Sequence, residues 1–258
     1  MQRMKRAAAY LLLFAATTVF AQTPPPSATN SLEVKYVRDG AEYATLTRQV
    51  YRLATSSALD RAAKRAKGSW GVVLDIDETT LDNSVYQLDR VSYGLSYEQA
   101  SWGSWILRSE AGMVPGVKDF LDAVRKAGGH VAFITDRTTE WTYADGTKVD
   151  SVKPTRENLI RHSLWNEDDR LCLKSTKEDT KAVRRKSVAT GEGTCAWPGT
   201  RVDVLVFVGD QLGDFPQSGE DFAGAGTDAQ FGKSFFLLPN PMYGGWTNSV
   251  TRVFGSFK

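Results

Sequence analysis

An acidic segment that directly follows an apolar run constrains this chain more than any other feature. The segment "LDIDETTLDNS" (residues 74–84) comes after "GVV" and carries four carboxylates within eight positions: Asp75, Asp77, Glu78 and Asp82. Like charges at this density repel one another and resist burial, so a fold that buries them needs a cation or a reaction that uses them. The segment therefore predicts a metal site or a reaction centre at the end of a buried strand.

Apolar runs alternate with helical segments along most of the chain. Strands are expected at residues 70–76, 130–137, 170–175, 201–210 and within 233–246. Helices are expected within residues 31–67, 88–113, 115–129, 153–165 and 177–191. Strands that alternate with helices favour a Rossmann-like α/β fold, in which helices flank a parallel sheet and form its right-handed crossovers.

The N-terminus has the pattern of a secretory signal peptide. Basic residues within the first six positions precede an apolar stretch at residues 7–20, and small residues lead up to Ala21. Because a membrane-spanning helix needs ~20 apolar residues, cleavage after Ala21 with no remaining membrane anchor is favoured over a retained anchor. We therefore expect a periplasmic or secreted protein.

The rest of the chain is expected to form one domain. Residues 22–30 are rich in Pro, Ser and Thr and predict a linker, so the domain would span residues 31–258. Its core would cover about residues 70–250, with the N-terminal helices and inserted segments as a smaller, mainly helical cap. The net charge is only +2 and the longest basic run is "RRK", so no nucleic-acid polymer is expected as a partner. Whether the protein is a monomer or a homodimer stays open.

Acidic residues follow two of the predicted strands. Asp75 and Asp77 follow the first, and Asp210 and Asp214 follow the strand at 201–210. Functional residues of such sheets gather at the carboxyl ends of the strands, so adjacent strands would bring the four acids together. Four acids in one crevice need a divalent cation, and oxygen ligands without spare His or Cys favour Mg²⁺.

Two of these acids can divide the work of phosphoryl transfer. An acid that attacks phosphorus has to be ionised, whereas an acid that protonates a leaving alcohol needs a raised pKa. Asp75 and Asp77 lie two positions apart at a strand end and can supply such a pair.

Five motifs, taken together, resemble those of one enzyme family. "DIDETTLDN" (75–83) resembles the D-x-D-x-T motif of the haloacid-dehalogenase (HAD) superfamily, and "ITDR" (134–137) resembles its second motif. "GDQLGDF" (209–215) resembles its fourth motif. Together with "PGVKDFL" (115–121) and "LPNPMYGGW" (238–246), they are similar to class C nonspecific acid phosphatases, which are exported bacterial phosphomonoesterases with 5′-nucleotidase-like members.

This resemblance implies a role for each motif residue. Asp75 would be the nucleophile that forms an aspartyl-phosphate, and Asp77 the general acid and later base. Thr135 would donate a hydrogen bond to the transferred phosphoryl group. Asp75, the backbone carbonyl of Asp77 and Asp210 would hold Mg²⁺, and Asp214 would order a metal-bound water.

The chain departs from the family pattern in the second motif, and its third motif is ambiguous. The second motif usually reads "ITNR", but this chain has Asp136, which would lie near the phosphate and which we expect to pair with Arg137. Both residues are candidates for substrate binding. The lysine of the third motif is Lys174, Lys177 or Lys181, and the "KAVRR" sequence favours Lys181 at a helix start.

We expect the two cysteines, Cys172 and Cys195, to form a disulfide. A disulfide between them would be permitted after export and would close a loop worth roughly 3 kcal/mol. Two free buried thiols are the alternative. A bond would fix the distance between the sheet and the helix that carries Lys181.

Aromatic residues predict the substrate class. Trp102, Trp105 and Tyr243 lie in segments that would cover the site, and aromatic side chains stack on flat rings with ~1–3 kcal/mol per ring. We therefore expect a preference for nucleoside monophosphates and aryl phosphates among small phosphomonoesters. The alternatives are a non-catalytic storage or binding protein of the same fold, and a sugar-phosphate phosphatase or phosphotransferase.

Overall fold

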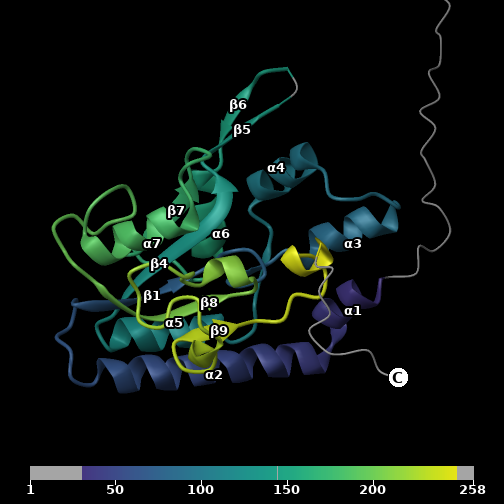
Figure 1. Cartoon of the computed structure of the whole chain (residues 1–258). Helices are drawn as coiled ribbons and strands as arrows, with labels where there is room; N and C mark the ends of the chain where they lie inside the picture. Colours follow the sequence, from purple (N-terminus) through teal and green to yellow (C-terminus); the bar gives the residue numbers. More distant parts are fainter. Residues whose placement is uncertain (1–30, 144, 249–258) are drawn as a thin grey trace, which may run out of the picture.

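The computed structural model describes residues 31–143 and 145–248. At its centre is a five-stranded sheet in the order β7-β4-β1-β8-β9, with all neighbouring strands parallel (Figure 1). The strands are β1 (Trp70–Leu74), β4 (His130–Thr138), β7 (Arg170–Lys174), β8 (Asp203–Gly209) and β9 (Phe235–Leu237). Four of them lie within the segments predicted as strands, β4 extends one residue beyond its predicted segment, and the predicted α/β class is confirmed. The predicted signal peptide and linker lie outside the described residues.

Strand β1 is central because apolar side chains cover both of its faces. Leu74 lies opposite Phe133 of β4 and opposite Val208 of β8. Successive side chains of a strand point to opposite faces, so Leu74 packs into one hydrophobic core and Val73 into the other. The loop after β1 therefore leaves the sheet between the loops after β4 and β8.

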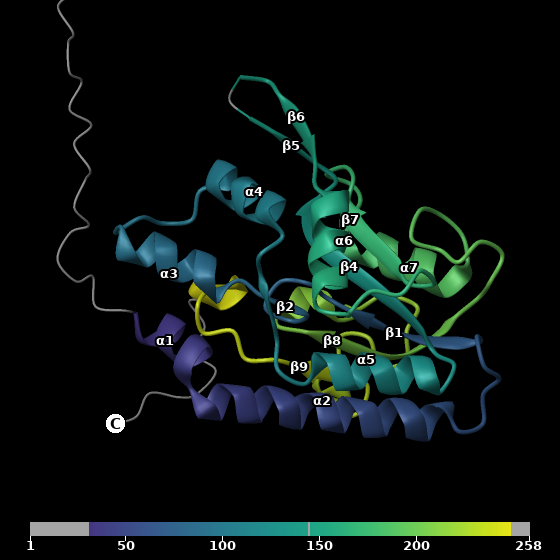
Figure 2. The same ribbon diagram turned by 180° about the vertical axis from the view of Figure 1, so that it is seen from behind.

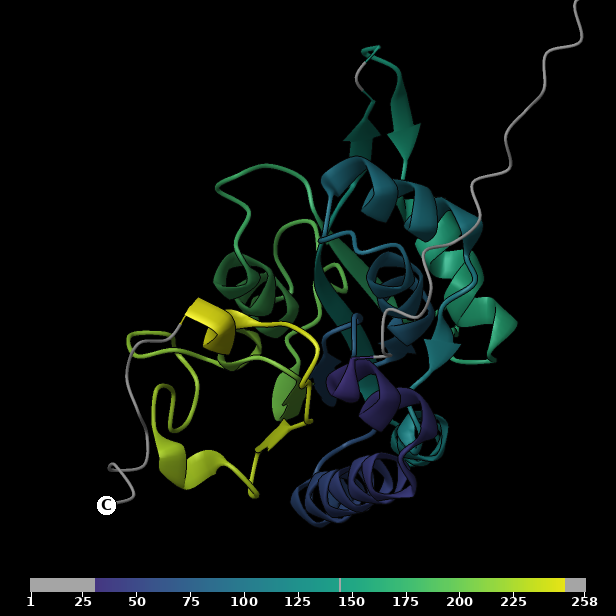
Figure 3. The same ribbon diagram turned by 90° about the vertical axis from the view of Figure 1, so that its right-hand side faces the viewer.

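Helices cover both faces of the sheet. The main ones are α2 (Ala41–Ala62), α5 (Val117–Lys126), α6 (Val152–Arg161) and α7 (Lys181–Thr190), whereas α1 (Leu32–Asp39) packs against α2. Helices α2 and α5 lie side by side on one face, while α7 packs on the other (Figures 1 and 3). We expected the N-terminal helices in the cap, but α2 packs against the sheet itself.

Two insertions lie beyond the carboxyl ends of the strands. The first, between β1 and α5, holds β2 (Leu81–Asp82), α3 (Ser84–Ser92), α4 (Gln99–Arg108) and β3 (Gly112–Met113). The second follows β4 and is a hairpin of β5 (Glu140–Thr142) and β6 (Lys148–Asp150), which projects from the body of the protein (Figure 2). The remaining elements are short 3-10 helices: η1 (Leu212–Asp214), η2 (Asp228–Gln230) and η3 (Gly245–Asn248).

The positions of the two cysteines fit the predicted disulfide. Cys172 in β7 and Cys195, which follows α7, lie at disulfide distance with Cα atoms 5.6 Å apart. Both are buried, and the loop that they close contains all of α7. In the described part of the chain, no helix combines the length and hydrophobicity that crossing a bilayer requires.

Candidate active site

A tight turn at the end of β1 positions the first acidic residue. The backbone N–H of Asp75 donates to the carbonyl of Val208 at 3.0 Å, so Asp75 still follows the sheet. Directly after it, the carbonyl of Ile76 accepts bonds from the N–H groups of Thr80 and Leu81, both at 2.8 Å. The hydroxyl of Thr80 also donates to the carbonyl of Asp75 at 2.7 Å. These bonds make the acidic loop a fixed turn.

The end of β8 supplies the other two acids of the cluster. Asp210 follows the strand, and Asp214 ends η1, where its carboxylate accepts from the N–H of Gln211 at 2.9 Å. This turn requires glycine at Gly209, because a Cβ there would overlap the side chain of Asp214. The amide of Asn240, beyond β9, donates to Asp210 at 2.9 Å.

Three carboxylates meet at this edge of the sheet. One oxygen from each of Asp75, Asp210 and Asp214 lies within 4.8 Å of the others. Burial raises the pKa of Asp210 to about 7, with a further contribution from Asp214. Burial also raises the pKa of Asp75 well above its ordinary value, although Lys181 opposes this shift. An all-oxygen group of acids in a poorly solvated position fits a hard divalent cation, which would offset both their burial and their mutual repulsion.

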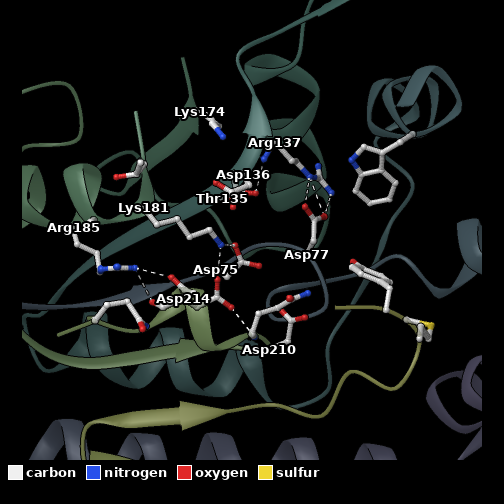
Figure 4. A pocket seen from close by; sticks show the side chains of 18 of the residues that line it. Asp75, Asp77, Thr135, Asp136, Arg137, Lys174, Lys181, Arg185, Asp210 and Asp214 are labelled. Atoms are coloured by element: carbon white, nitrogen blue, oxygen red, sulfur yellow. Dashed lines mark hydrogen bonds and ion pairs between the residues drawn. The ribbon is translucent and has the colours of Figure 1, made fainter. Parts of the chain in front are cut away.

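Lys181 lies between two of the acids (Figure 4). It is the first residue of α7, and its Nζ atom is 2.5 Å from Oδ1 of Asp75 and 2.5 Å from Oδ1 of Asp214. Burial by itself lowers the pKa of Lys181, but the two carboxylates outweigh this effect and keep the pKa above its ordinary value. Of the other two candidate lysines, Lys174 lines the same cavity, and Lys177 is exposed away from it.

The side chain of Asp77 does not join the carboxylate cluster that we expected it to share. It turns toward β4, where Nη2 of Arg137 lies 2.6 Å from its Oδ1 atom (Figure 4). Nε of Arg137 lies 3.1 Å from each of its oxygens. The physical reason is the full burial of Arg137, whose charge needs a paired carboxylate. The loop thus separates Asp75 and Asp77 into two electrostatic environments.

Thr135 and Asp136 lie on opposite faces at the end of β4. Thr135 is buried, lines the cavity, and accepts a bond from the N–H of Arg137 at 3.1 Å. Asp136 is exposed and pairs with Arg184 at 3.0 Å. The expected pair between Asp136 and Arg137 is therefore wrong, because the alternation of the strand points neighbouring side chains to opposite faces.

A cavity of about 1080 Å³ opens over these residues. Besides the acids, Thr135, Lys181 and Arg137, its lining includes the aromatic side chains of Tyr97, Trp102 and Tyr243. Trp105 does not line it: this side chain is only 4% exposed and packs in the hydrophobic core. The predicted contact of Trp105 with substrate therefore has no support in its position.

Arg185 and Tyr97 are among the cavity residues that were not predicted from the sequence. Arg185 is buried and donates to the carbonyls of Gly213 and Asp214 at 3.1 and 3.2 Å. It lies four positions after Lys181 on the same helix, and this spacing places both on one face, so periodicity could have identified it. Tyr97 lies in the irregular segment before α4 and has no such signal.

The chain matches the sequence model of the HAD superfamily, subfamily IIIB (acid phosphatase), over residues 11–246. Two similar solved structures are both of the class C acid phosphatase from Bacillus anthracis. One is 28% identical in sequence, with a TM-score of 0.65 over 83% of this chain and 85% of the other. The second, with tungstate bound, is 29% identical, with the same TM-score and coverage.

Proposed function

This chain belongs to the acid phosphatases of HAD subfamily IIIB and is a phosphomonoesterase, and we propose that it works through a phosphorylated Asp75. The observation that carries this proposal is the contact between Lys181 and Asp75. One carboxylate oxygen of Asp75 is held at 2.5 Å by Nζ of Lys181, which fixes the orientation of the carboxylate. Orienting the attacking oxygen in this way is the main contribution that a protein makes to phosphoryl transfer.

The proposed reaction has two steps. In the first, an oxygen of Asp75 attacks phosphorus, the bond to the leaving oxygen breaks, and Asp77 gives that oxygen a proton. In the second, Asp77 takes a proton from water, whose oxygen attacks phosphorus and releases inorganic phosphate and free Asp75. The separate environments of Asp75 and Asp77 support this division of roles.

The remaining motif residues would bind the phosphoryl group and a cation. Thr135 and Lys181 line the cavity and would donate to phosphoryl oxygens. Asp75, Asp210, Asp214 and the carbonyl of Asp77 would provide the oxygen ligands for a divalent metal, which we take to be Mg²⁺. When bound, this ion would neutralise negative charge on the phosphoryl group and allow an anionic nucleophile to approach.

The aromatic lining supports a preference for substrates with a flat ring. Trp102 and Tyr243 line the cavity, as their predicted stacking on a substrate ring requires, and Tyr97 adds a third ring. We therefore propose nucleoside monophosphates and aryl phosphates as favoured small-molecule substrates. We also propose that the protein is exported by the signal peptide at residues 1–21 and acts in the periplasm or outside the cell.

One assay tests the reaction and the metal together. Purified protein would be incubated with p-nitrophenyl phosphate, AMP or glycerol 3-phosphate, in EDTA and then with added Mg²⁺. We expect hydrolysis only with Mg²⁺, with AMP preferred over glycerol 3-phosphate, and a phosphorylated peptide containing Asp75 in acid-quenched samples. Full activity in EDTA would contradict the metal role, and a preference for the alkyl phosphate would favour a sugar-phosphate phosphatase.

A further inference from the structure

The carboxylate of Asp77 is held unevenly. Its Oδ1 atom accepts from Nη2 of Arg137 at 2.6 Å, from Nε of Arg137 at 3.1 Å and from the side-chain amide of Asn83 at 2.9 Å. From the residues that the structure describes, its Oδ2 atom receives only the shared Nε of Arg137, at 3.1 Å. One oxygen of this cavity residue is therefore saturated with donors, and the other keeps lone-pair capacity.

Asn83 is a fully buried residue whose amide is fixed in one orientation. Its side-chain nitrogen donates to Asp77 and also to Oε2 of Glu78 at 3.2 Å, while its backbone N–H donates to Oε1 of Glu78 at 2.8 Å. Its side-chain oxygen accepts from Nε1 of Trp105 at 2.8 Å and from Nη2 of Arg137 at 3.5 Å. Both groups can only donate, so together they hold the oxygen of Asn83 in place and direct the amide nitrogen toward Asp77.

Arg137 is fixed by comparable contacts. Its guanidinium is 1% exposed, and Nη1 donates to the hydroxyl of Thr155 at 3.2 Å. Trp102 lies beside it, with the guanidinium carbon 5.8 Å from the ring centroid. The two side chains whose donors saturate Oδ1 of Asp77 are therefore themselves held, Arg137 by α6 and Asn83 by α4.

We propose that Asn83 and Arg137 are positioning residues for Asp77, that Trp105 acts through Asn83, and that Oδ2 is the atom that carries the transferred proton. With Oδ1 occupied, Oδ2 is left to give its proton to the leaving oxygen while the electron pair of the breaking P–O bond stays on that oxygen. The hydrogen bonds from Asn83 and Arg137 also hold the Asp77 side chain away from the carboxylate cluster to which Asp75 belongs. This proposal rests on the proposed function, since it needs Asp77 as the general acid.

The position of Trp105 in the core then has a functional meaning. Its ring packs beside Tyr86, with centroids 6.2 Å apart, and its N–H is the one polar atom that it presents to the site. Trp105→Phe keeps most of the packing but removes the closer of the two donors that fix the amide of Asn83. The matched control is Trp197→Phe, because Trp197 is equally buried and its Nε1 donates at 2.7 Å to the carbonyl of Asp168, in the other core.

The test compares two substrates of similar shape that differ in their need for an acid. p-Nitrophenyl phosphate releases a stable anion, whereas p-methylphenyl phosphate depends on protonation of its leaving oxygen. The ratio of their kcat/KM values reports on the acid in the first step, and a general loss of folded protein does not change it. Asp77→Asn has no acidic proton to donate, so this variant should show the largest ratio that loss of the acid can produce.

We expect Asn83→Ala and Trp105→Phe each to raise the ratio of nitrophenyl to methylphenyl kcat/KM by about tenfold, a part of the 10²–10⁴ that a general acid supplies. Trp197→Phe should leave the ratio at its wild-type value. Melting curves would confirm folding, and if Asn83→Ala does not fold, Trp105→Phe alone decides.

The outcomes separate this proposal from the proposed function. If Asp77→Asn raises the ratio but Trp105→Phe and any folded Asn83→Ala do not, the positioning proposal is wrong while the acid role stands. If Trp105→Phe slows both substrates equally, Trp105 is only structural and the proposal again fails. If Asp77→Asn itself leaves the ratio unchanged, the acid role fails and the positioning proposal fails with it.

Discussion

The side-chain amine of Lys181 lies 2.5 Å from a carboxylate oxygen of Asp75, although the two residues are 106 positions apart in the sequence. The parallel sheet makes this contact, because β1 ends at the same edge at which α7 begins after β7. Lys181 is buried with the acids, so its charge acts in a medium that screens it poorly. The contact therefore identifies Lys181, among the three candidate lysines, as the one with the strongest predicted effect on activity.

Substitution of the three lysines by methionine should give graded effects. Lys181→Met removes the cation next to Asp75, and we expect kcat to fall by about 10²–10³, as for the loss of a group that stabilises transition-state charge. Lys174→Met should have a smaller effect, because Lys174 only lines the cavity, and Lys177→Met should match the wild type. Steady-state kinetics at saturating Mg²⁺ would measure all three. A larger loss for Lys174→Met would show that the phosphate-site lysine is Lys174.

Asp75→Asn should abolish turnover and leave the fold intact. The substitution keeps the shape of the side chain but removes the attacking charge and one metal ligand, so we expect kcat to fall at least about 10³-fold. Asp122→Asn is the matched control, because Asp122 is exposed on α5 and pairs only with Lys118 on the surface, where such pairs contribute little. Circular dichroism would check the fold. Near-wild-type activity of a pure Asp75→Asn preparation would remove Asp75 from the mechanism.

The sequence was sufficient for the parts of the site that depend on topology alone. Asp75, Asp210 and Asp214 each follow a strand, and any parallel sheet with β1 next to β8 brings such residues together. It was not sufficient for choosing ion-pair partners. Arg137 binds Asp77, and Asp136 binds Arg184, because the pleat at the end of β4 decides which side chain points to which face.

The roles of the two tryptophans on α4 were also beyond the sequence. Trp102 lines the cavity and Trp105 is buried, although they lie one helical turn apart and have the same chemistry. Helical periodicity places both near one face, but it does not say where on that face the core ends and the cavity begins. Trp105 lies on the core side of that boundary, where its N–H donates to the buried Asn83.

Removal of metal should make stability fall as the pH rises. Burial, with Asp214, raises the pKa of Asp210 from 3.8 to about 7 in the folded state. The folded protein therefore binds this proton more tightly than the unfolded chain does, and the stabilisation is complete below pH 3.8 and lost as the pH rises through about 7. Urea unfolding in EDTA should show a lower free energy of unfolding at pH 7 than at pH 5, with a slope of at most about 1.4 kcal/mol per pH unit for one proton.

Asp210→Asn is the control for this pH effect. The amide does not titrate, so the decrease in stability between pH 5 and pH 7 in EDTA should be smaller than in the wild type. Added Mg²⁺ should stabilise the wild type more at pH 7 than at pH 5, because ligands have to be deprotonated to bind metal. Stability in EDTA that increases from pH 5 to pH 7, with no difference between wild type and Asp210→Asn, would contradict the raised pKa.

The disulfide should stabilise the helix that carries Lys181. Cys172 and Cys195 are 23 positions apart, and the bond closes a loop whose constraint is worth roughly 3 kcal/mol. Alkylation of the native protein without reductant should add no mass, and the same treatment after reduction should modify both cysteines. The double variant Cys172→Ala/Cys195→Ala should lose a comparable free energy of unfolding. Two alkylated cysteines in the unreduced protein from an exporting host would refute the bond.

Tyr243 should determine the preference for substrates with rings. Its ring lines the cavity, and its hydroxyl donates to Glu78, so the hydrogen bond fixes the ring over the site. Tyr243→Ala removes a stacking partner worth ~1–3 kcal/mol, and we expect KM for AMP to rise by roughly 5- to 100-fold while KM for glycerol 3-phosphate rises less than about twofold. Tyr243→Phe is the matched control, because it keeps the ring and loses only the bond to Glu78, so its KM for AMP should stay much closer to that of the wild type. If Tyr243→Ala raises both KM values equally, Tyr243 has only a structural role, and the preference for nucleotides has to come from Trp102 and Tyr97 alone.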